Sequence, residues 1–316
     1  MDPVTHTLSG LAVAHAGFRQ RIGRIAVVAV TAGALAPDLD SIMGLWDQFA
    51  ALKYHRGLTH SLVGGVLLAL LVAWPLHRIA LRWGVRVRYR DLAGLTYLGI
   101  MVHIGLDLIT SFGTRVLWPF SEARLALDLA FIVDPLLTAT FAVPLLVAWW
   151  RPRLAARAVR VGLASGLLYL ALAAGARAVA AEGFTGWLRS QGIQVERVTL
   201  LPRLFGPFLW LGVAEAPGGL YQAAVKGWTG TVAGFRLYSQ APRNGYIEKS
   251  DALDSVRLFL AFARFPWVRY LQDGEEHVVE YRDIRFGTEH GMNDMALRVI
   301  IDGAGRVKGV DFNHRF

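Results

Sequence analysis

The sequence has no cysteine among its 316 residues. A disulfide, a cysteine nucleophile and a cysteine-ligated zinc site are therefore excluded, and any metal site must use histidine and carboxylate ligands. Charge is also scarce, because only 18% of the residues are Asp, Glu, Lys or Arg, against about 25% in soluble domains. With 54% hydrophobic residues, the composition excludes a disordered chain and disfavours a wholly soluble fold.

Acidic residues are especially scarce in the first part of the chain. Residues 1–181 contain 17 Lys and Arg but only 9 Asp and Glu, whereas residues 182–316 contain 16 and 15. The excess positive charge therefore lies in the apolar part. It forms short clusters between apolar runs and not one solvated basic face, so nucleic-acid binding is not expected.

Six apolar segments divide the first 181 residues. Only the last two or three approach the length of about 20 residues expected of a complete transmembrane helix. Shorter helices can still cross where their polar ends line a protein cavity. The sequence predicts a mostly α-helical, polytopic membrane bundle of about six helices over residues 1–181, followed by a small extramembrane α+β domain over residues 182–316. The apolar segments are 4–18, 25–36, 61–76, 92–109, 129–150 and 161–181.

The positions of the arginines predict an orientation. Three basic clusters contain no acidic residue and follow the first, third and fifth apolar segments. Because cytoplasmic connections are enriched in Lys and Arg, all three are expected in the cytoplasm. A six-helix path with both termini outside satisfies this rule, and it predicts a multi-pass protein of the inner (plasma) membrane with its C-terminal domain on the outer, periplasmic side. The clusters are Arg19/Arg21/Arg24, Arg78/Arg82/Arg86/Arg88/Arg90 and Arg151/Arg153/Arg157/Arg160.

The pattern after Glu182 changes to short alternating runs that are typical of strands. Asp302 to Gly305 has the composition of a hairpin turn. Residues 250–264 predict a single amphipathic helix ended by Pro266. The predicted strands are 195–200, 221–225, 235–238, 278–285, 296–301 and 307–312.

A few polar residues interrupt the apolar part, and the predicted orientation places them at outer helix ends. Ionisable groups at membrane depth are costly and are candidate functional residues. His103 and Asp107 are four residues apart in one predicted helix, so both project from one face. They can bind one metal ion, or form a ligand and its hydrogen-bond partner. A buried His–Asp hydrogen bond without a metal is the alternative.

Two further motifs add candidate ligands. Pro37 ends the preceding helix, and an extended stretch after it would aim Asp38 and Asp40 the same way, although a simple helix cap would also explain these residues. His55 and His60 flank a glycine just before the next apolar segment. Loop geometry there can bring the two imidazoles together.

His6 opens the first helix and joins this set, with an interfacial histidine as the alternative. Four histidines and three aspartates exceed the four ligands of one tetrahedral zinc ion. The sequence therefore predicts a divalent metal centre, with zinc as the expected metal and two or more ions. The predicted ligands are His6, Asp38, Asp40, His55, His60, His103 and Asp107.

Three other residues are candidates for catalysis. Arg115 follows the His103/Asp107 helix, and Arg56 lies between the two histidines. Their guanidinium groups match phosphate oxygens, although a lipid-headgroup contact or a surface ion pair is the alternative for each. Asp134, at the outer end of its helix, is a candidate general base or orienting residue.

These motifs together resemble the YdjM-type family. That family comprises inner-membrane proteins described as metal-dependent hydrolases, associated by name with LexA control, and it is distantly similar to zinc-dependent phospholipase C and P1-type nucleases. The resemblance implies a helical metal site built from the seven predicted ligands. Its motifs are Asp2-Pro3-Val4-Thr5-His6, Pro37-Asp38-Leu39-Asp40, His55 to Ser61, His103-Ile104-Gly105-Leu106-Asp107 and Thr110 to Ser121.

The sequence and the resemblance together predict a membrane-bound metal-dependent hydrolase. It would act through activated water on a phosphoester or lipid-linked ester at the outer face, so a membrane lipid or lipid-linked substrate is the expected partner. Protein partners are unknown. The alternatives are an ion or metal transporter, in which the same cluster binds the permeant ion, and a membrane scaffold with a structural metal. The absence of an acidic or histidine path toward the cytoplasmic end disfavours the transporter.

Overall fold

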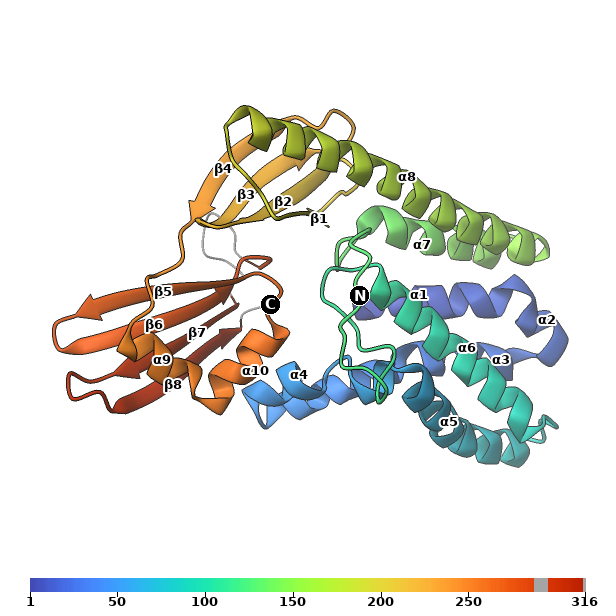
Figure 1. The fold of residues 1–316 in the computed structure, drawn as a ribbon. Helices are drawn as coiled ribbons and strands as arrows, with labels where there is room; N and C mark the ends of the chain where they lie inside the picture. The colour runs from blue at the N-terminus through green and yellow to red at the C-terminus, as the bar shows by residue number, and fades with distance from the viewer. Residues whose placement is uncertain (287–294, 315–316) are drawn as a thin grey trace.

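The computed structural model describes residues 1–286 and 295–314. Its first part is helical (Figure 1). The α-helices there are α1 (Pro3–Val13), α2 (Arg19–Ile22), α3 (Arg24–Leu35), α4 (Gln48–Tyr54), α5 (Leu62–Arg82), α6 (Tyr89–Leu108), α7 (Pro135–Trp150) and α8 (Ala155–Ser190). A π-helical turn, Ala14–Phe18, and three 3₁₀ helices, Pro37–Leu45, Leu58–His60 and Pro152–Leu154, join them.

Three of these helical segments are long and apolar enough to cross a membrane: Leu62–Arg82, Tyr89–Leu108 and Pro152–Ser190. A fourth span arises if Arg24–Leu35 and Pro37–Gly44, bent by 41°, count as one. The prediction of about six spans is therefore not supported. The physical reason is that two of the expected helices are too short. Helix α1 has 11 residues and α7 has 16, whereas a complete span needs roughly 20.

The helices nevertheless pair as hairpins. Figure 1 shows the turns from α1 to α3, from α5 to α6 and from α7 to α8 at one end of the bundle, away from the C-terminal sheets. These are the three connections that carry the basic clusters. The opposite end, facing the sheets, contains the predicted metal ligands.

Helices α3 and α6 pack backbone against backbone. A Cβ added at Gly33 would lie 2.1 Å from the carbonyl oxygen of Thr96, and one added at Gly99 would lie 2.1 Å from that of Val30. Only glycine allows so close an approach at these two positions. The contact brings the C-terminal end of α3 against the last turns of α6.

The C-terminal part contains two four-stranded antiparallel sheets, ordered β1-β2-β3-β4 and β5-β6-β7-β8. The strands are β1 (Arg197–Pro202), β2 (Leu209–Ala216), β3 (Gly219–Lys226), β4 (Val232–Tyr238), β5 (Pro266–Asp273), β6 (Glu276–Asp283), β7 (Met295–Ile301) and β8 (Val307–His314). The predicted turn at Asp302 to Gly305 joins β7 to β8, closed by a 2.8 Å bond from the Gly305 amide to the Asp302 carbonyl.

The single amphipathic helix predicted over residues 250–264 is wrong. The structure has α9 (Gly245–Asp251) and α10 (Asp254–Phe262), separated where Leu253 adopts an extended conformation. Asn244 caps α9 by accepting hydrogen bonds from two backbone amides, so the first helix begins five residues earlier than expected. Pro266 opens β5.

Each sheet is anchored to the helical part. The β1–β4 sheet packs on the C-terminal half of α8, where Phe184 and Leu188 bury Trp210 (Figure 1). The β5–β8 sheet packs on α9 and α10, and this core includes Leu52 of α4. The second sheet therefore reaches the helices that flank the predicted metal ligands.

Candidate metal centre

Four predicted ligands converge at the end of the bundle that faces the sheets. Asp38, His60, His103 and Asp107 each offer one ligand atom, and these four atoms all lie within 4.8 Å of one another. His60, His103 and Asp107 are fully buried, whereas Asp38 is partly exposed. Asp38 comes from the 3₁₀ helix after α3, His60 directly precedes Ser61, which caps α5, and the other two are on α6.

The spacing of these atoms matches a tetrahedral ligand set. His60 Nε2 lies 3.0 Å from His103 Nε2, 3.5 Å from Asp38 Oδ1 and 3.3 Å from Asp107 Oδ2. His103 Nε2 lies 3.5 Å from each of the same two carboxylate oxygens. Ligands about 2.0–2.2 Å from a zinc ion in a tetrahedron are about 3.3–3.6 Å apart. Five of the six ligand separations thus fall at or just below this range.

A hydrogen bond fixes the proton position on His103, and another is compatible with the same neutral tautomer of His60. His103 Nδ1 lies 2.8 Å from the carbonyl oxygen of Ala34, which can only accept, so Nδ1 carries the proton and Nε2 has a free lone pair. The Thr59 hydroxyl donates to Asp40 Oδ2 and can accept from His60 Nδ1, 3.0 Å away. This arrangement leaves both Nε2 lone pairs facing each other beside two carboxylate oxygens. Such a set of acceptors needs a positive charge among them.

The environment of His60 shows the same need for positive charge. Burial alone would lower the pKa of His60, but hydrogen bonds with Asp107, Asp38 and Asp40 raise this pKa to about 10. Without a cation, the carboxylates therefore hold a proton on His60. A divalent cation bound at Nε2 would take the place of that proton, as in other sites where metal ions and protons compete.

A second, smaller group consists of Asp40, His55 and His60. Asp40 Oδ1 lies 2.6 Å from His55 Nδ1, and Asp40 Oδ2 lies 3.3 Å from His60 Nδ1. His60 presents a different nitrogen to each group. The described residues thus form one four-residue group and one three-residue group that share an imidazole, and both could hold a metal ion.

The carboxylates of Asp38 and Asp40 point to different sides of His60. We predicted an extended stretch after Pro37 that would aim both the same way, but residues 37–45 form a 3₁₀ helix. With about three residues per turn, side chains two apart are separated by about 240°. Asp38 therefore faces Nε2 of His60 and Asp40 faces Nδ1.

His6 lies beside the four-residue group without belonging to it. Its ring stacks on His103, with centroids 3.7 Å apart, and its Nε2 is 3.4 Å from Asp107 Oδ1. Neither ring nitrogen of His6 has a hydrogen-bond partner among the described residues, and the same is true of Asp107 Oδ2. Buried polar atoms are normally paired, so these orphaned atoms fit a site that holds a cation.

The other oxygen of Asp107 is already neutralised. Arg56 Nη2 donates to Asp107 Oδ1 at 2.8 Å, and the Met1 amino group also bonds to Oδ1. Arg56 Nη1 donates to the Thr110 hydroxyl at 3.0 Å. Arg56 is thus buried beneath the cluster, where it orients Asp107 so that Oδ2 faces the two histidines.

Asp134 belongs to neither ligand group. One of its oxygens accepts hydrogen bonds from the amides of Leu136 and Leu137, which makes Asp134 the N-terminal cap of α7. Its other oxygen lies 2.6 Å from the Tyr169 hydroxyl of α8. These contacts connect Asp134 to α7 and α8 and not to the predicted metal ligands.

Four arginines lie close together beside the cluster. Burial, together with the positive charges of Arg115, Arg285 and Arg56, lowers the pKa of Arg124 to about 10. Arg115 and Arg124 donate to the adjacent carbonyls of Lys53 and Leu52 in α4. Among the described residues, Arg56 Nε, Arg115 Nε and Arg124 Nη1 have no acceptor. This concentration of free, buried N–H groups favours an anion.

Arg124 was not among the predicted site residues. It reaches the cluster because the segment after α6 folds back on itself, pairing Thr114 with Leu125 in an isolated antiparallel bridge. The only sequence signal was its place in the short connection that also contains Arg115.

The second sheet holds the loop that covers the cluster. Arg285, two residues after β6, donates to the Ser111 carbonyl at 2.8 Å and to the Phe112 carbonyl at 3.2 Å. The Phe112 ring in turn packs against His55, with centroids 5.9 Å apart, and lies 4.6 Å from the Arg56 guanidinium carbon. The C-terminal part therefore contributes to the wall of the site.

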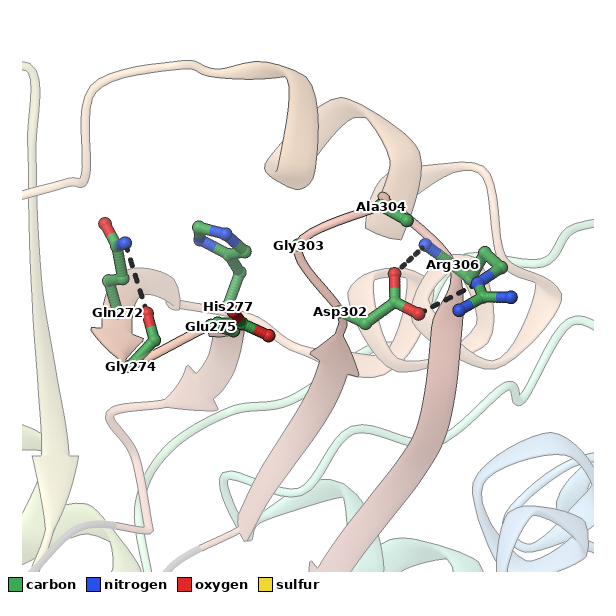
Figure 2. Close-up of a pocket in the computed structure, with 8 residues that line it drawn as sticks. All are labelled: Gln272, Gly274, Glu275, His277, Asp302, Gly303, Ala304 and Arg306. Carbon is green, nitrogen blue, oxygen red and sulfur yellow. Dashed lines mark hydrogen bonds and ion pairs between the residues drawn. The ribbon is translucent and has the colours of Figure 1, made fainter.

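A separate surface pocket lies at the tips of the β5–β6 and β7–β8 hairpins (Figure 2). Most of its polar side chains already have partners. His277 bonds to the Tyr270 hydroxyl at 2.7 Å, and Asp302 pairs with Arg306 at 2.9 Å. None of the metal-binding groups found among the described residues lies there.

The fold and the site define a membrane protein with a buried cluster of Asp and His residues that could hold a metal ion. The family model described as YdjM inner membrane protein matches residues 1–183. The chain belongs to the YdjM inner membrane protein family. The matched residues include every predicted site residue.

A curated relative carries no assigned activity. The chain is 26% identical to "Uncharacterized protein YfhP" of Bacillus subtilis (strain 168) over 142 residues. The match covers 43% of this chain and 42% of YfhP, so it spans less than half the length of that relative. No solved structure matches the chain.

Proposed function

We propose that this protein is a membrane-bound, metal-dependent hydrolase that cleaves a phosphoester or a lipid-linked ester at the outer face of the inner membrane. The observation that carries the proposal is the convergence of two histidine Nε2 atoms and two carboxylate oxygens at tetrahedral spacing. The orphaned atoms of His6 and Asp107 support it.

We assign Asp38, His60, His103 and Asp107 as the metal ligands. A set of two imidazoles and two carboxylates suits zinc, because zinc accepts nitrogen and oxygen donors in tetrahedral geometry. A bound divalent ion of this kind supplies Lewis-acid activation of water and of an ester oxygen. His6, stacked on His103, fixes the orientation of that ring.

We assign the proton-accepting role to His55 in place of Asp134. The His55 side chain is 20% exposed, so it can reach a substrate, whereas Asp134 is fully buried. Asp40 Oδ1 lies 2.6 Å from His55 Nδ1, an arrangement in which a carboxylate orients an imidazole and stabilises its protonated form. This assignment needs one ion per chain. A second ion would instead take Asp40 and His55 as ligands.

The arginine cluster favours a phosphoester over a neutral ester. Guanidinium N–H groups bind phosphate oxygens, and three of them are buried without an acceptor among the described residues. Arg124 Nη2 donates to the Leu52 carbonyl at 2.9 Å, and Arg115 Nη1 pairs with the exposed Glu122 carboxylate at 3.1 Å. We propose that Arg115 and Arg124 bind the anionic group of the substrate, while Arg56 orients Asp107.

The test is metal analysis combined with hydrolysis, on the full chain purified in detergent. His103→Ala removes a ligand, and His77→Ala is the matched control because His77 packs against Tyr89 near the basic turn after α5. We expect one zinc per chain and hydrolysis of bis(p-nitrophenyl) phosphate in the native protein and in His77→Ala. Both should be lost from folded His103→Ala.

Other outcomes would contradict the proposal. Retention of zinc by folded His103→Ala would overturn the ligand assignment, and two ions per chain would overturn the role of His55 as a base. Metal-dependent flux into proteoliposomes without hydrolysis of phosphodiesters or short-chain phospholipids would identify a transporter. A scaffold with a structural metal would give two results together: His103→Ala would fail to fold, and the native protein would contain zinc but show no hydrolysis.

A further inference from the structure

The loop between β1 and β2 exposes large apolar side chains. Leu204, Phe205 and Phe208 are 45%, 54% and 57% exposed, and all lie within five residues. Phe205 also has a positive φ of 61°, a conformation that is costly for a bulky residue. Large apolar side chains that stay exposed on a strained backbone indicate a functional surface.

This loop is held against the membrane part of the chain. The Tyr169 hydroxyl of α8 contacts both the carbonyl oxygen of Gly206, at the centre of the loop, and the Asp134 carboxylate that caps α7. Tyr169 lies midway along the uncharged stretch of α8 between Arg160 and Arg177. Neighbouring α8 residues that face outward, Leu167 and Leu168, are also exposed and apolar.

The length of α7 gives the depth of this junction. With 16 residues, α7 rises about 24 Å from the Arg151 turn to Asp134. If the basic turn lies at the membrane surface, as arginines require, the junction is about 6 Å inside a hydrocarbon core of about 30 Å. A tilt of α7 would place it deeper. The loop therefore begins at the level of lipid acyl chains.

The loop backbone is suited to that environment, because nearly apolar surroundings require internal hydrogen bonds. The amides of Gly206 and Phe208 donate to the carbonyls of Arg203 and Phe205 at 2.8 and 3.2 Å. The Phe208 carbonyl accepts from the Gly227 amide at 2.9 Å, and the Trp210 ring donates to the carbonyl of Pro207 at 3.1 Å.

We propose that the β1–β2 loop, residues 203–208, inserts into the membrane leaflet on the side of the C-terminal domain and contacts lipid acyl chains. Leu204, Phe205 and Phe208 are the inserted side chains. The loop covers the polar outer end of α7, which is too short to reach the surface, and it fixes the β1–β4 sheet to the bilayer. The proposal does not depend on the hydrolase activity.

Single cysteines test this insertion cleanly because the chain has none. Leu204→Cys, Phe205→Cys and Phe208→Cys would each be labelled with a nitroxide in the full chain, reconstituted in phosphatidylethanolamine/phosphatidylglycerol vesicles. Power-saturation spectroscopy then compares the accessibility of each label to oxygen, which concentrates in lipid, and to a water-soluble nickel chelate. Leu167→Cys on α8 serves as the lipid reference. Leu237→Cys, an exposed apolar residue of the same sheet, serves as the aqueous control.

We expect at least two of the three loop labels to resemble Leu167→Cys, with oxygen accessibility several-fold above that of the nickel chelate, and Leu237→Cys to show the reverse. Loop labels that are reached by the chelate as readily as Leu237→Cys would overturn the proposal. So would loop labels shielded from both reagents, because protein and not lipid would then cover the loop.

Discussion

Replacing Gly99 with alanine would separate the positioning of the metal ligands from their chemistry. Gly99 lies one turn before His103 on α6, and an added Cβ would be 2.1 Å from the Val30 carbonyl oxygen on α3. Carbon–oxygen contacts require about 3.3 Å. Helices α3 and α6 must therefore move apart by about 1.2 Å at this crossing.

That movement reaches the candidate metal centre through one hydrogen bond. The bond from His103 Nδ1 to the Ala34 carbonyl, 2.8 Å long, would lengthen to about 4 Å, beyond hydrogen-bonding distance. His103 would then lose the partner that fixes its tautomer. Losing such a partner costs about 10- to 100-fold in metal affinity, or about 1.4–2.8 kcal/mol.

The assay is competition for zinc against a chromogenic chelator, using the purified chain. Gly105→Ala is the matched control, since Gly105 lies between His103 and Asp107 in sequence but a Cβ there meets no atom within 4 Å. Gly33→Ala tests the same helix contact from α3. Unchanged zinc affinity in folded Gly99→Ala and Gly33→Ala would refute the reasoning, and so would an equal loss in Gly105→Ala.

Two further predictions concern the C-terminal part. Arg264 binds both oxygens of buried Asp128, at 2.8 and 2.9 Å, and Arg177 lies 3.7 Å from the same carboxylate. Arg264→Ala should destabilise the protein by about 1.5–3 kcal/mol, because Arg177 still compensates part of the buried charge. A melting temperature equal to that of the native chain would contradict this. Burial raises the pKa of Glu280, but hydrogen bonds from Arg298 and Arg282 outweigh it and lower this pKa below 4.5. The ionised Glu280 carboxylate therefore stabilises the fold fully above its unfolded-state pKa, and this contribution is lost as the pH falls through the lower native pKa. In Glu280→Gln, the free energy of unfolding should consequently fall less steeply with decreasing pH. Denaturation followed by circular dichroism at a series of acidic pH values measures this.

Local spacing was enough to predict the part of the site that lies on one helix. His103 and Asp107 were expected to share a face because they are four residues apart, and the distance of 3.5 Å between His103 Nε2 and Asp107 Oδ2 shows that they do. The direction of Asp38 and Asp40 was wrong because it depended on the backbone after Pro37. That segment continues as a 3₁₀ helix and not as an extended chain.

Strand β2 shows why part of the fold escaped prediction. Alternation of apolar and polar residues identifies strands with one buried face, but β2 is buried on both. Trp210 and Ala214 face α8, whereas Leu211 and Val213 pack against Phe265 in the other direction. Its sequence consequently reads as a continuous apolar run, which periodicity alone cannot assign to a strand.

The wall of the site depends on contacts that no local pattern contains. The segment after α6 is held from the C-terminal side at two points, by Arg264 on Asp128 and by Arg285 on the carbonyls of Ser111 and Phe112. Phe112 then packs against one side of His55 and against Arg56. The sequence pattern divides the chain into a membrane part and an extramembrane domain, yet these contacts make the C-terminal part a structural component of the candidate metal centre. A chain shortened to its helical part would accordingly keep the four ligands but lose the support of the arginine-lined wall beside them.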